Sequence, residues 1–338
     1  MAIEQKKLGY FSSLDLLRGL ASVAVIFFHF THGNKGYLSH DNFLWIIGKY
    51  GFLGVDVFFV LSGFVIPYAM YRGRYKIASF GRFMVKRVVR IEPPYLISIA
   101  LILVLNYLST LSPYYRGAAF HIDYTALALH IGYFNAFFHY PWVNDVYWTL
   151  AIEFQFYILV ALLLPLLIHP KKYISILTIT IFAILGVFIT DHSYIFNYGL
   201  LFVVGILMFQ FQIGYLKKGE FGLLLLIVLI MIFAKFDKRY LIAALLPYFF
   251  VMYFDFSNSF SKFLGNISYS LYLIHIPIGG RIINLTATFT DNELIRGVFV
   301  FVAMAVSIFA SWVFFKLIEK PTMLLSKRLS YQKKKQVT

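Results

Sequence analysis

Long runs without a charged side chain constrain this sequence more than any other feature. The chain has 338 residues, of which 60% are hydrophobic and only 13% charged. About 20 consecutive apolar residues let a helix cross the hydrocarbon core of a bilayer, where backbone groups must bond within the helix. The sequence therefore predicts an all-α polytopic membrane protein, and it excludes a large soluble domain because the polar surface is too small.

Ten segments are predicted membrane spans, and an eleventh is ambiguous. The ambiguous segment, 124–138 ("YTALALHIGYFNAFF"), is short and could cross, re-enter or lie in the membrane interface. The ten predicted spans are 14–32, 50–70, 90–108, 147–168, 173–190, 195–213, 220–234, 240–256, 267–289 and 294–317.

The distribution of Lys and Arg favours ten crossings over eleven. Residues 71–90 and the tail 318–338 are both strongly basic, and basic loops remain in the cytoplasm. Ten spans place both regions inside, whereas an eleventh would move the tail outside. We therefore predict about ten transmembrane helices, a re-entrant or interfacial segment near 124–138, and cytoplasmic N- and C-termini. The exception is "KFDKR" (235–239), which this topology leaves outside.

Composition narrows the kinds of site that the chain can carry. We expect one membrane domain, 1–338, made of a helical bundle (14–317) and a basic cytoplasmic tail (318–338), and the start does not resemble a cleaved signal peptide. The sequence has no cysteine, so thiolate nucleophiles and thiolate metal sites are excluded, and no metal site is predicted. The net charge of +15 points to membrane lipid rather than to nucleic acid.

The first predicted span carries a polar stripe. At 100° per residue, eleven residues bring His29 back to the face of Arg18, about 16 Å further along the axis; Asp15 and Ser22 share that face. Because such groups are costly in hydrocarbon, they should face a wet or protein-lined cavity. The alternative is that Asp15 pairs with Arg18 at the headgroups while His29 reaches the outer edge.

Two carboxylates are predicted at a depth similar to that of His29. Asp56 lies in the second span, and Glu153 lies in the fourth on one face with Thr149 and Tyr157. A histidine with a carboxylate in reach is the smallest general-base arrangement. We predict His29, Glu153 and Asp56 as catalytic residues, with the carboxylate partner left open. Alternatively, Asp56 fixes a helix-packing contact.

Other polar and aromatic residues are candidates for substrate binding. Ser268, Tyr272 and His275 recur at i, i+4 and i+7, although His275 could equally be a packing histidine. The segment 107–146 is rich in aromatic residues, as carbohydrate-binding surfaces often are. The predicted substrate-binding residues are Trp142, Trp148, Tyr272 and His275.

A basic cluster lies in "GRFMVKRVVRIEPPY" (81–95). Arg87 and Arg90 are one turn apart, with Lys86 beside them, where a helix enters the membrane from the cytoplasm. A guanidinium group suits phosphate oxygens, so the cluster could hold a phosphate. Its alternative role is to set topology and contact lipid headgroups.

Taken together, these segments resemble the acyltransferase-3 family of integral membrane acyltransferases, which modify sugars and other acceptors at the bacterial envelope. Five pieces match in the order of the family; one alone is a weak signal, but five in order are specific. The matching pieces are "LDLLRGLASVAVIFFHF", "GFLGVDVFFVLSGFVI", "KRVVRIEPPYL", "WTLAIEFQFY" and "LGNISYSLYLIHIPI".

The resemblance implies an acyl-CoA donor, usually acetyl-CoA, and a hydroxyl acceptor on a polysaccharide, lipid-linked glycan or other glycoside. It also implies a multi-pass protein of the bacterial inner membrane. Some members carry a further extracytoplasmic hydrolase-like domain; we expect this chain to complete the transfer itself or to pass the acyl group to a partner.

The resemblance also assigns roles to residues. His29 matches the essential histidine of the family and Arg18 its arginine. Glu153 matches the acid of the tryptophan-containing segment, although Thr149 stands where Ser is commoner. We expect an O-acyltransferase with His29 as general base, and the residues expected to bind the acyl-CoA are Arg18, Ser22, Lys86, Arg87 and Arg90. The alternative function is a proton-coupled transporter or flippase of a glycan or small solute, since polar seams also suit transport.

Overall fold

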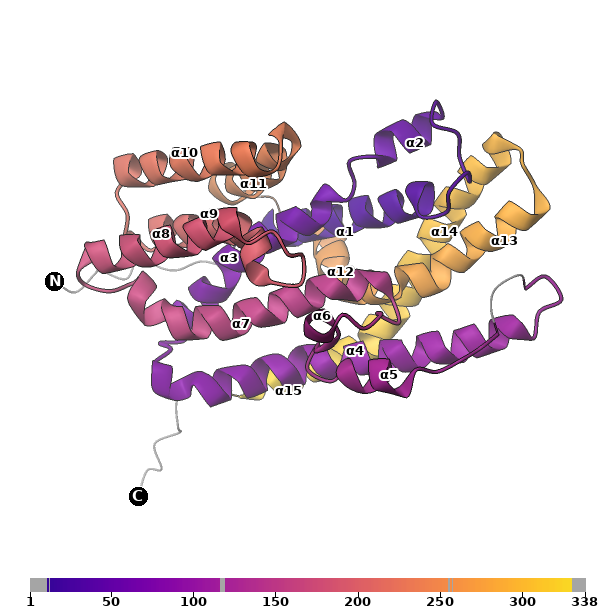
Figure 1. Cartoon of the computed structure of the whole chain (residues 1–338), viewed down its shortest axis with the longest axis horizontal. Helices are drawn as coiled ribbons and strands as arrows, with labels where there is room; N and C mark the ends of the chain where they lie inside the picture. Colours follow the sequence, from indigo (N-terminus) through magenta and orange to yellow (C-terminus); the bar gives the residue numbers. More distant parts are fainter. Residues whose placement is uncertain (1–10, 12, 116–118, 255, 257, 330–338) are drawn as a thin grey trace, which may run out of the picture.

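All regular structure in the described part of the chain is helical. The computed structural model describes residues 11, 13–115, 119–254, 256 and 258–329, and these residues form helices and no strand. The end of the predicted basic tail, 330–338, lies outside the described residues. Most helices run along the long axis of the molecule and pack into a bundle (Figure 1).

Each of the ten predicted spans falls on a long helix or a run of helices. Six stretches within the described residues are long and apolar enough to cross a bilayer: Ser13–His32, Phe43–Arg72, Ile77–Thr110, Asp145–Leu167, Ile195–Gln212 and Glu293–Arg328. The fold is therefore that of an all-α membrane protein. The long helices are α1 (Ser13–His32), α3 (Leu53–Arg72), α4 (Phe80–Thr110), α7 (Trp148–Leu167), α8 (Lys172–Phe188), α9 (Gly199–Gln212), α10 (Lys218–Lys235), α11 (Lys238–Tyr253), α12 (Ser259–His275) and α14 (Glu293–Phe314).

Shorter helices and turns connect these elements. Two π-helical turns interrupt long helices: Ile276–Gly280 follows α12, and Phe315–Glu319 follows α14. Three 3-10 turns, Ile77–Ser79, Asp145–Tyr147 and Ile195–Tyr198, precede α4, α7 and α9. The short α-helices are α2 (Phe43–Gly48), α5 (Tyr124–Leu129), α6 (Asn135–Phe138), α13 (Arg281–Phe289) and α15 (Lys320–Arg328).

The segment 124–138 folds as α5 and α6 and does not cross the bundle. Helices of six and four residues are far too short to span a bilayer. Gly132 and Tyr133, with φ of 81° and 63°, turn the chain between them. The Tyr133 side chain is only 1% exposed, and its ring lies 4.9 Å from that of Tyr95 on α4. The segment therefore inserts a side chain into the bundle.

Small residues bring the helices that carry the polar residues close together. A Cβ on Gly265 of α12 would lie 2.7 Å from Cα and Cβ of Asp15 on α1, and one on Gly205 of α9 would lie 2.1 Å from the Val60 carbonyl on α3. Close backbone approach of this kind is typical of helix packing in membranes. These close approaches hold α12 against the polar stripe of α1 and hold α9 against the face of α3 that carries Val60.

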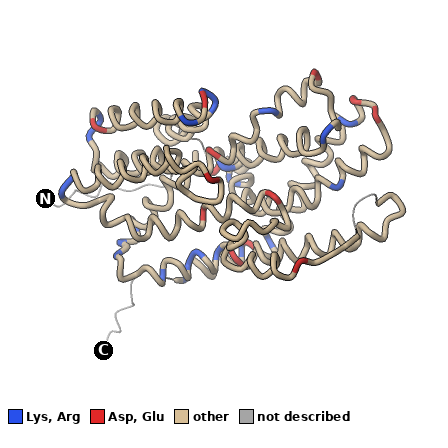
Figure 2. Tube along the Cα trace, in the orientation of Figure 1, with Lys and Arg blue, Asp and Glu red and all other residues tan. Residues whose placement is uncertain are grey.

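Charged residues lie mostly at helix ends and near the middle of the bundle (Figure 2). The basic segment 235–239, which the predicted topology leaves outside the cytoplasm, has contacts within the protein that explain its charges. Lys235 Nζ donates to the carbonyls of Gly186 (2.6 Å) and Asn197 (2.7 Å), so it caps the end of α8. Arg239 pairs with Asp237. Two of the three cations in "KFDKR" thus have protein partners of their own.

Candidate active site

The polar stripe of α1 divides between two environments. Arg18 lines a cavity inside the bundle, whereas the ring of His29, three turns further on, lies 5.2 Å from the ring of His275 on α12. Ser22, between them, is buried and donates to the Gly19 carbonyl at 2.9 Å. Its hydroxyl is therefore used within the helix.

The cavity lies among α1, α3, α4, α7, α12 and the π-helical turn after α14. Its volume is about 170 Å³, enough for several water molecules or for part of a ligand. One wall is apolar, with Phe58, Phe59 and Ile91. The polar lining comprises Arg18, Ser62, Arg87, Arg90, Thr149, Glu153, Tyr157, Ser268, Tyr269, Tyr272 and Glu319.

Three arginines line this cavity. Arg18, Arg87 and Arg90 form no hydrogen bond and no ion pair with any residue that the structure describes. The Arg87 guanidinium lies over the rings of Phe83 (5.3 Å) and Tyr157 (5.0 Å). Arg90 is in the electrostatic field of both other arginines and of Glu319. Like charges held together in this way favour an anionic ligand between them.

Two carboxylates accompany the arginines, and each is held by hydroxyl donors. Glu153 accepts hydrogen bonds from Tyr157 (2.6 Å) and Ser62 (3.2 Å). Glu319 accepts from the backbone N–H (3.1 Å) and hydroxyl (2.5 Å) of Ser270. Both carboxylates therefore keep fixed positions on the cavity wall.

Sequence reasoning did not select Glu319, Ser62 or Tyr269 as site residues. For Glu319 a signal exists: the buried residues Ser307 and Ser311 of α14 are four residues apart, and Glu319 follows eight residues later on the same spacing. That spacing was readable in the sequence. The positions of Ser62 and Tyr269 depend on which face of α3 meets α7 and which face of α12 meets α4, and the sequence alone does not provide either.

Among the described residues, His29 forms no hydrogen bond or ion pair with either predicted carboxylate partner. Glu153 lies in the cavity with the arginines, and Asp56, 5% exposed on α3, interacts electrostatically with Tyr198 and Tyr240 instead. The group that the structure places beside His29 is the imidazole of His275.

The predicted substrate-binding residues occupy three places. The Tyr272 hydroxyl borders the cavity, 2.5 Å from the Thr149 hydroxyl, and His275 follows one turn later. Trp148 stacks on Tyr198 at 5.3 Å, on the side of α7 that faces α9. Trp142 lies near α5, edge-on to His130 at 5.4 Å. Only Tyr272 of the four therefore lines the cavity.

Lys86 lies apart from its two arginine neighbours. Its Nζ donates to the Leu329 carbonyl at 3.1 Å, and its own carbonyl accepts from Ser326 of α15 at 2.9 Å. Lys86 thus joins α15 to α4, and it does not line the cavity. Across the described residues, no group of three or more His, Asp or Glu side chains could hold a metal ion.

Comparison with known proteins decides the family. Residues 11–316 match the profile of acyltransferase-3, described as "Acyltransferase domain". The chain belongs to the acyltransferase-3 family. The match covers α1 to α14 and so includes His29, His275 and every lining residue of the cavity except Glu319.

Two staphylococcal relatives of this acyltransferase-3 chain illustrate the similarity. "O-acetyltransferase OatA" of Staphylococcus aureus (strain NCTC 8325 / PS 47) is 31% identical over 195 residues, which cover 54% of this chain and 30% of the relative. "Putative O-acetyltransferase SACOL0978" of S. aureus (strain COL) is 27% identical over 327 residues, covering 81% and 51%. The chain therefore spans between about a third and half of these relatives. No solved structure matches it.

Proposed function

We propose that this protein is a membrane-embedded O-acetyltransferase that moves an acetyl group from cytosolic acetyl-CoA to a hydroxyl of an envelope glycan or other glycoside. Membership of the acyltransferase-3 family and the names of two relatives support the reaction class. The observation that carries the proposal is the set of three arginines in one cavity that have no hydrogen-bond or ion-pair partner among the described residues. One of them, Arg18, shares a face of α1 with His29.

The donor would bind at the arginines. Acetyl-CoA carries several phosphate groups, and Arg18, Arg87 and Arg90 offer guanidinium groups that no acceptor in the described part of the chain occupies. A cavity of about 170 Å³ is smaller than most ligand pockets. It would therefore hold only part of the donor, with the rest extending toward the cytoplasm and the thioester arm extending along α1.

His29 would act as the general base. Its neutral imidazole takes the proton from the acceptor hydroxyl, the hydroxyl oxygen bonds to the thioester carbonyl carbon, and the carbon–sulfur bond breaks. The departing thiolate then takes the proton from His29, so the enzyme returns to its starting state. General-base catalysis contributes about 10²–10⁴-fold.

The acceptor would approach from the side opposite to the cytoplasmic donor. Residues 31–49 and 107–146 lie next to the outer end of α1 in the topology of ten spans that we propose, with both termini in the cytoplasm of a bacterial inner-membrane protein. Trp142 and the exposed aromatic residues Tyr124, Phe134 and Phe138 suit contact with sugars or with lipid headgroups.

The test is transfer of labelled acetyl from acetyl-CoA by the purified full-length protein to a panel of glycans and glycosides. We expect His29→Ala to abolish transfer, while His169→Ala, on the loop before α8, retains it at equal folded protein. Undiminished transfer by His29→Ala would remove His29 from the mechanism. If the wild-type protein moves the glycan across a vesicle membrane without acetylating it, the protein is a flippase instead.

A further inference from the structure

His275 is the last residue of α12 and one of the most deeply buried polar residues of the bundle, at 0% exposure. The π-helical turn Ile276–Gly280 follows it directly. Such turns interrupt the regular α-helical hydrogen bonds and occur frequently at functional sites. The proposed mechanism above assigns no role to this imidazole.

The hydrogen bonds of His275 fix its tautomer. Its Nδ1 lies 3.0 Å from the Leu271 carbonyl and 2.9 Å from the Tyr272 carbonyl. Because a carbonyl oxygen can only accept, Nδ1 carries the hydrogen and Nε2 of the neutral ring is an acceptor. Nε2 is buried and has no hydrogen-bond partner among the described residues. A polar atom left in this state destabilises the protein unless something binds to it.

His130 shows what a packing histidine looks like in the same protein. It is also 0% exposed, but both of its ring nitrogens are bonded to backbone. Nδ1 lies 2.7 Å from the Ala126 carbonyl, and Nε2 accepts the Val143 N–H at 3.1 Å. His130 is therefore complete without a ligand or a second side chain, whereas His275 has one free acceptor.

His29 is the group placed to supply the missing donor. The two imidazole centroids are 5.2 Å apart, with the rings inclined at 41°. The other rings around His275 are those of Phe30 and Tyr272, and its one titratable electrostatic neighbour among the described residues is His29. Catalytic hydrogen bonds are often long in the absence of substrate and tighten when it binds.

We propose that His275 is the positioning residue of His29: its Nε2 accepts the N–H of the His29 ring and thereby leaves the other ring nitrogen of His29 free to take the acceptor proton. In the triad arrangement a carboxylate performs this task. Here a neutral imidazole, held by two backbone carbonyls, takes the place of the carboxylate. The inference rests on the proposed role of His29 as general base.

This arrangement also accounts for the proton during the reaction. When His29 becomes an imidazolium, both of its nitrogens are donors, and the one facing His275 forms a charge-assisted hydrogen bond. The hydrogen on Nδ1 of His275 stays bonded to that nitrogen and is donated to the two carbonyls, and the proton taken from the acceptor stays on His29 until the thiolate removes it. His275 thus orients the base and stabilises its charged form without entering the covalent chemistry.

Two substitutions separate this role from packing. Leu at position 275 fills similar space without an acceptor, whereas Gln places an amide oxygen close to where Nε2 lies. We expect His275→Leu to lower kcat about 10²-fold with the KM for acetyl-CoA unchanged. We expect the kcat of His275→Gln to be at least about tenfold higher than that of His275→Leu. His130→Leu is the matched control: its melting temperature should fall, and its kcat per folded molecule should remain that of the wild type.

A measurement independent of turnover completes the test. In ¹⁵N NMR of the histidine-labelled full-length protein, we expect one tautomer of His29 in the wild type and in His275→Gln, and a mixture in His275→Leu. Equal kcat in the wild type and His275→Leu, or one unchanged tautomer in all three, would overturn the inference. Retained transfer in His29→Ala would overturn only the role of His29 as general base, and the NMR result would still decide whether His275 orients His29. Absence of transfer by the wild-type protein would overturn the proposed function instead.

Discussion

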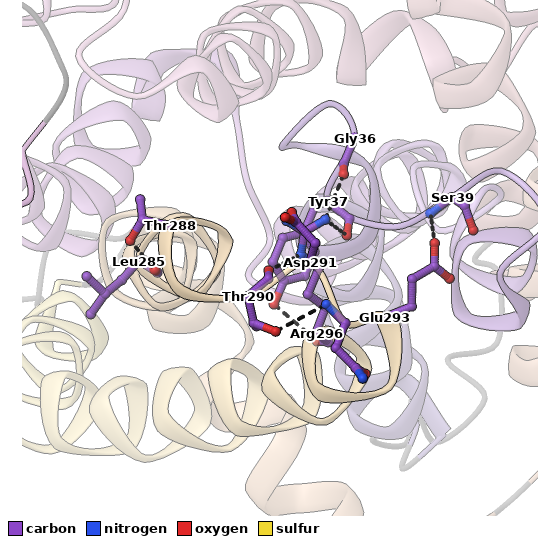
Figure 3. Close-up of polar contacts among 10 residues, drawn as sticks. Gly36, Tyr37, Ser39, Leu285, Thr288, Thr290, Asp291, Glu293 and Arg296 are labelled. Atoms are coloured by element: carbon purple, nitrogen blue, oxygen red, sulfur yellow. Dashed lines mark hydrogen bonds and ion pairs between the residues drawn. The ribbon is translucent and has the colours of Figure 1, made fainter.

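The buried Arg296 and the three arginines of the cavity differ in whether the protein supplies hydrogen-bond acceptors for their guanidinium groups. Arg296, in the first turn of α14, is 8% exposed, and every side of its guanidinium group meets an acceptor (Figure 3). Its partners are the carbonyls of Thr290, Gly36 and Tyr37 and the carboxylate of Asp291, at 2.6–3.1 Å. The cavity arginines Arg18, Arg87 and Arg90 have no such partner among the described residues.

The difference separates a structural arginine from a ligand-binding one. Arg296 joins the loop after α1 to the start of α14, and Glu293 adds a second contact by accepting the Ser39 N–H at 2.9 Å. The fold alone explains why a cation is there. The cavity arginines repel one another and form no hydrogen bond with the residues that the structure describes, so a bound anion explains them better than packing does.

The largest expected effect comes from replacing Arg87 and Arg90 together with Met. Charge-assisted hydrogen bonds contribute about 1.5–3 kcal/mol each, and each 1.4 kcal/mol is about tenfold. We expect the kcat/KM for acetyl-CoA to fall about 10²–10⁴-fold, with the affinity for the acceptor nearly unchanged. Steady-state kinetics with each substrate varied in turn measures both.

The same double variant has an opposite effect on stability. Removing two mutually repelling, partly buried cations should raise the melting temperature of the ligand-free protein and abolish the further rise that CoA produces in the wild type. A melting temperature that falls while CoA binding survives would identify these arginines as structural.

Arg296→Met is expected to change stability and not chemistry. The carbonyls of Tyr37 and Thr290 lose their donor, whereas water can replace the bond to the exposed Gly36. At about 1–3 kcal/mol for each buried group left unsatisfied, we expect a loss of about 2–3 kcal/mol. Chemical denaturation in detergent measures this loss of stability. If kcat per folded molecule fell more in Arg296→Met than in the Arg87/Arg90 double variant, the distinction between structural and ligand-binding arginines would be contradicted.

The same contrast shows what the sequence could and could not predict. Helix positions followed from apolar runs, because α1, α3, α7 and α14 have strong compositional signals. Arg18, Arg87, Arg90, Glu153 and Tyr272 were selected by helical spacing, and all five line one cavity. Helical spacing works here because polar residues on a membrane helix face the bundle interior.

What spacing could not provide is the partner across a helix interface. The depth of Asp56 suggested a role beside His29, whereas the residues on which Asp56 acts electrostatically in the structure include Tyr198 and Tyr240. His275 was equally compatible with packing until its free Nε2 was visible. Rotation of one helix against another depends on contacts such as Gly265 on Asp15, and those cannot be read from a single helix.

The smallest expected effect concerns a third kind of cation, one paired at the surface. Lys172 at the start of α8 contacts the Glu220 carboxylate of α10 at 2.7 Å, and both side chains are 40% exposed. Such pairs contribute about 0–1 kcal/mol and are screened by salt. We expect Lys172→Met to lower stability by less than about 1 kcal/mol, to lose that effect in about 1 M salt, and to leave acetyl transfer unchanged. The contrary result would be a loss of stability as large as that of Arg296→Met that persists at high salt. Only an ion pair shielded from salt could behave in that way, so this result would show that exposure does not distinguish Lys172 from the buried Arg296.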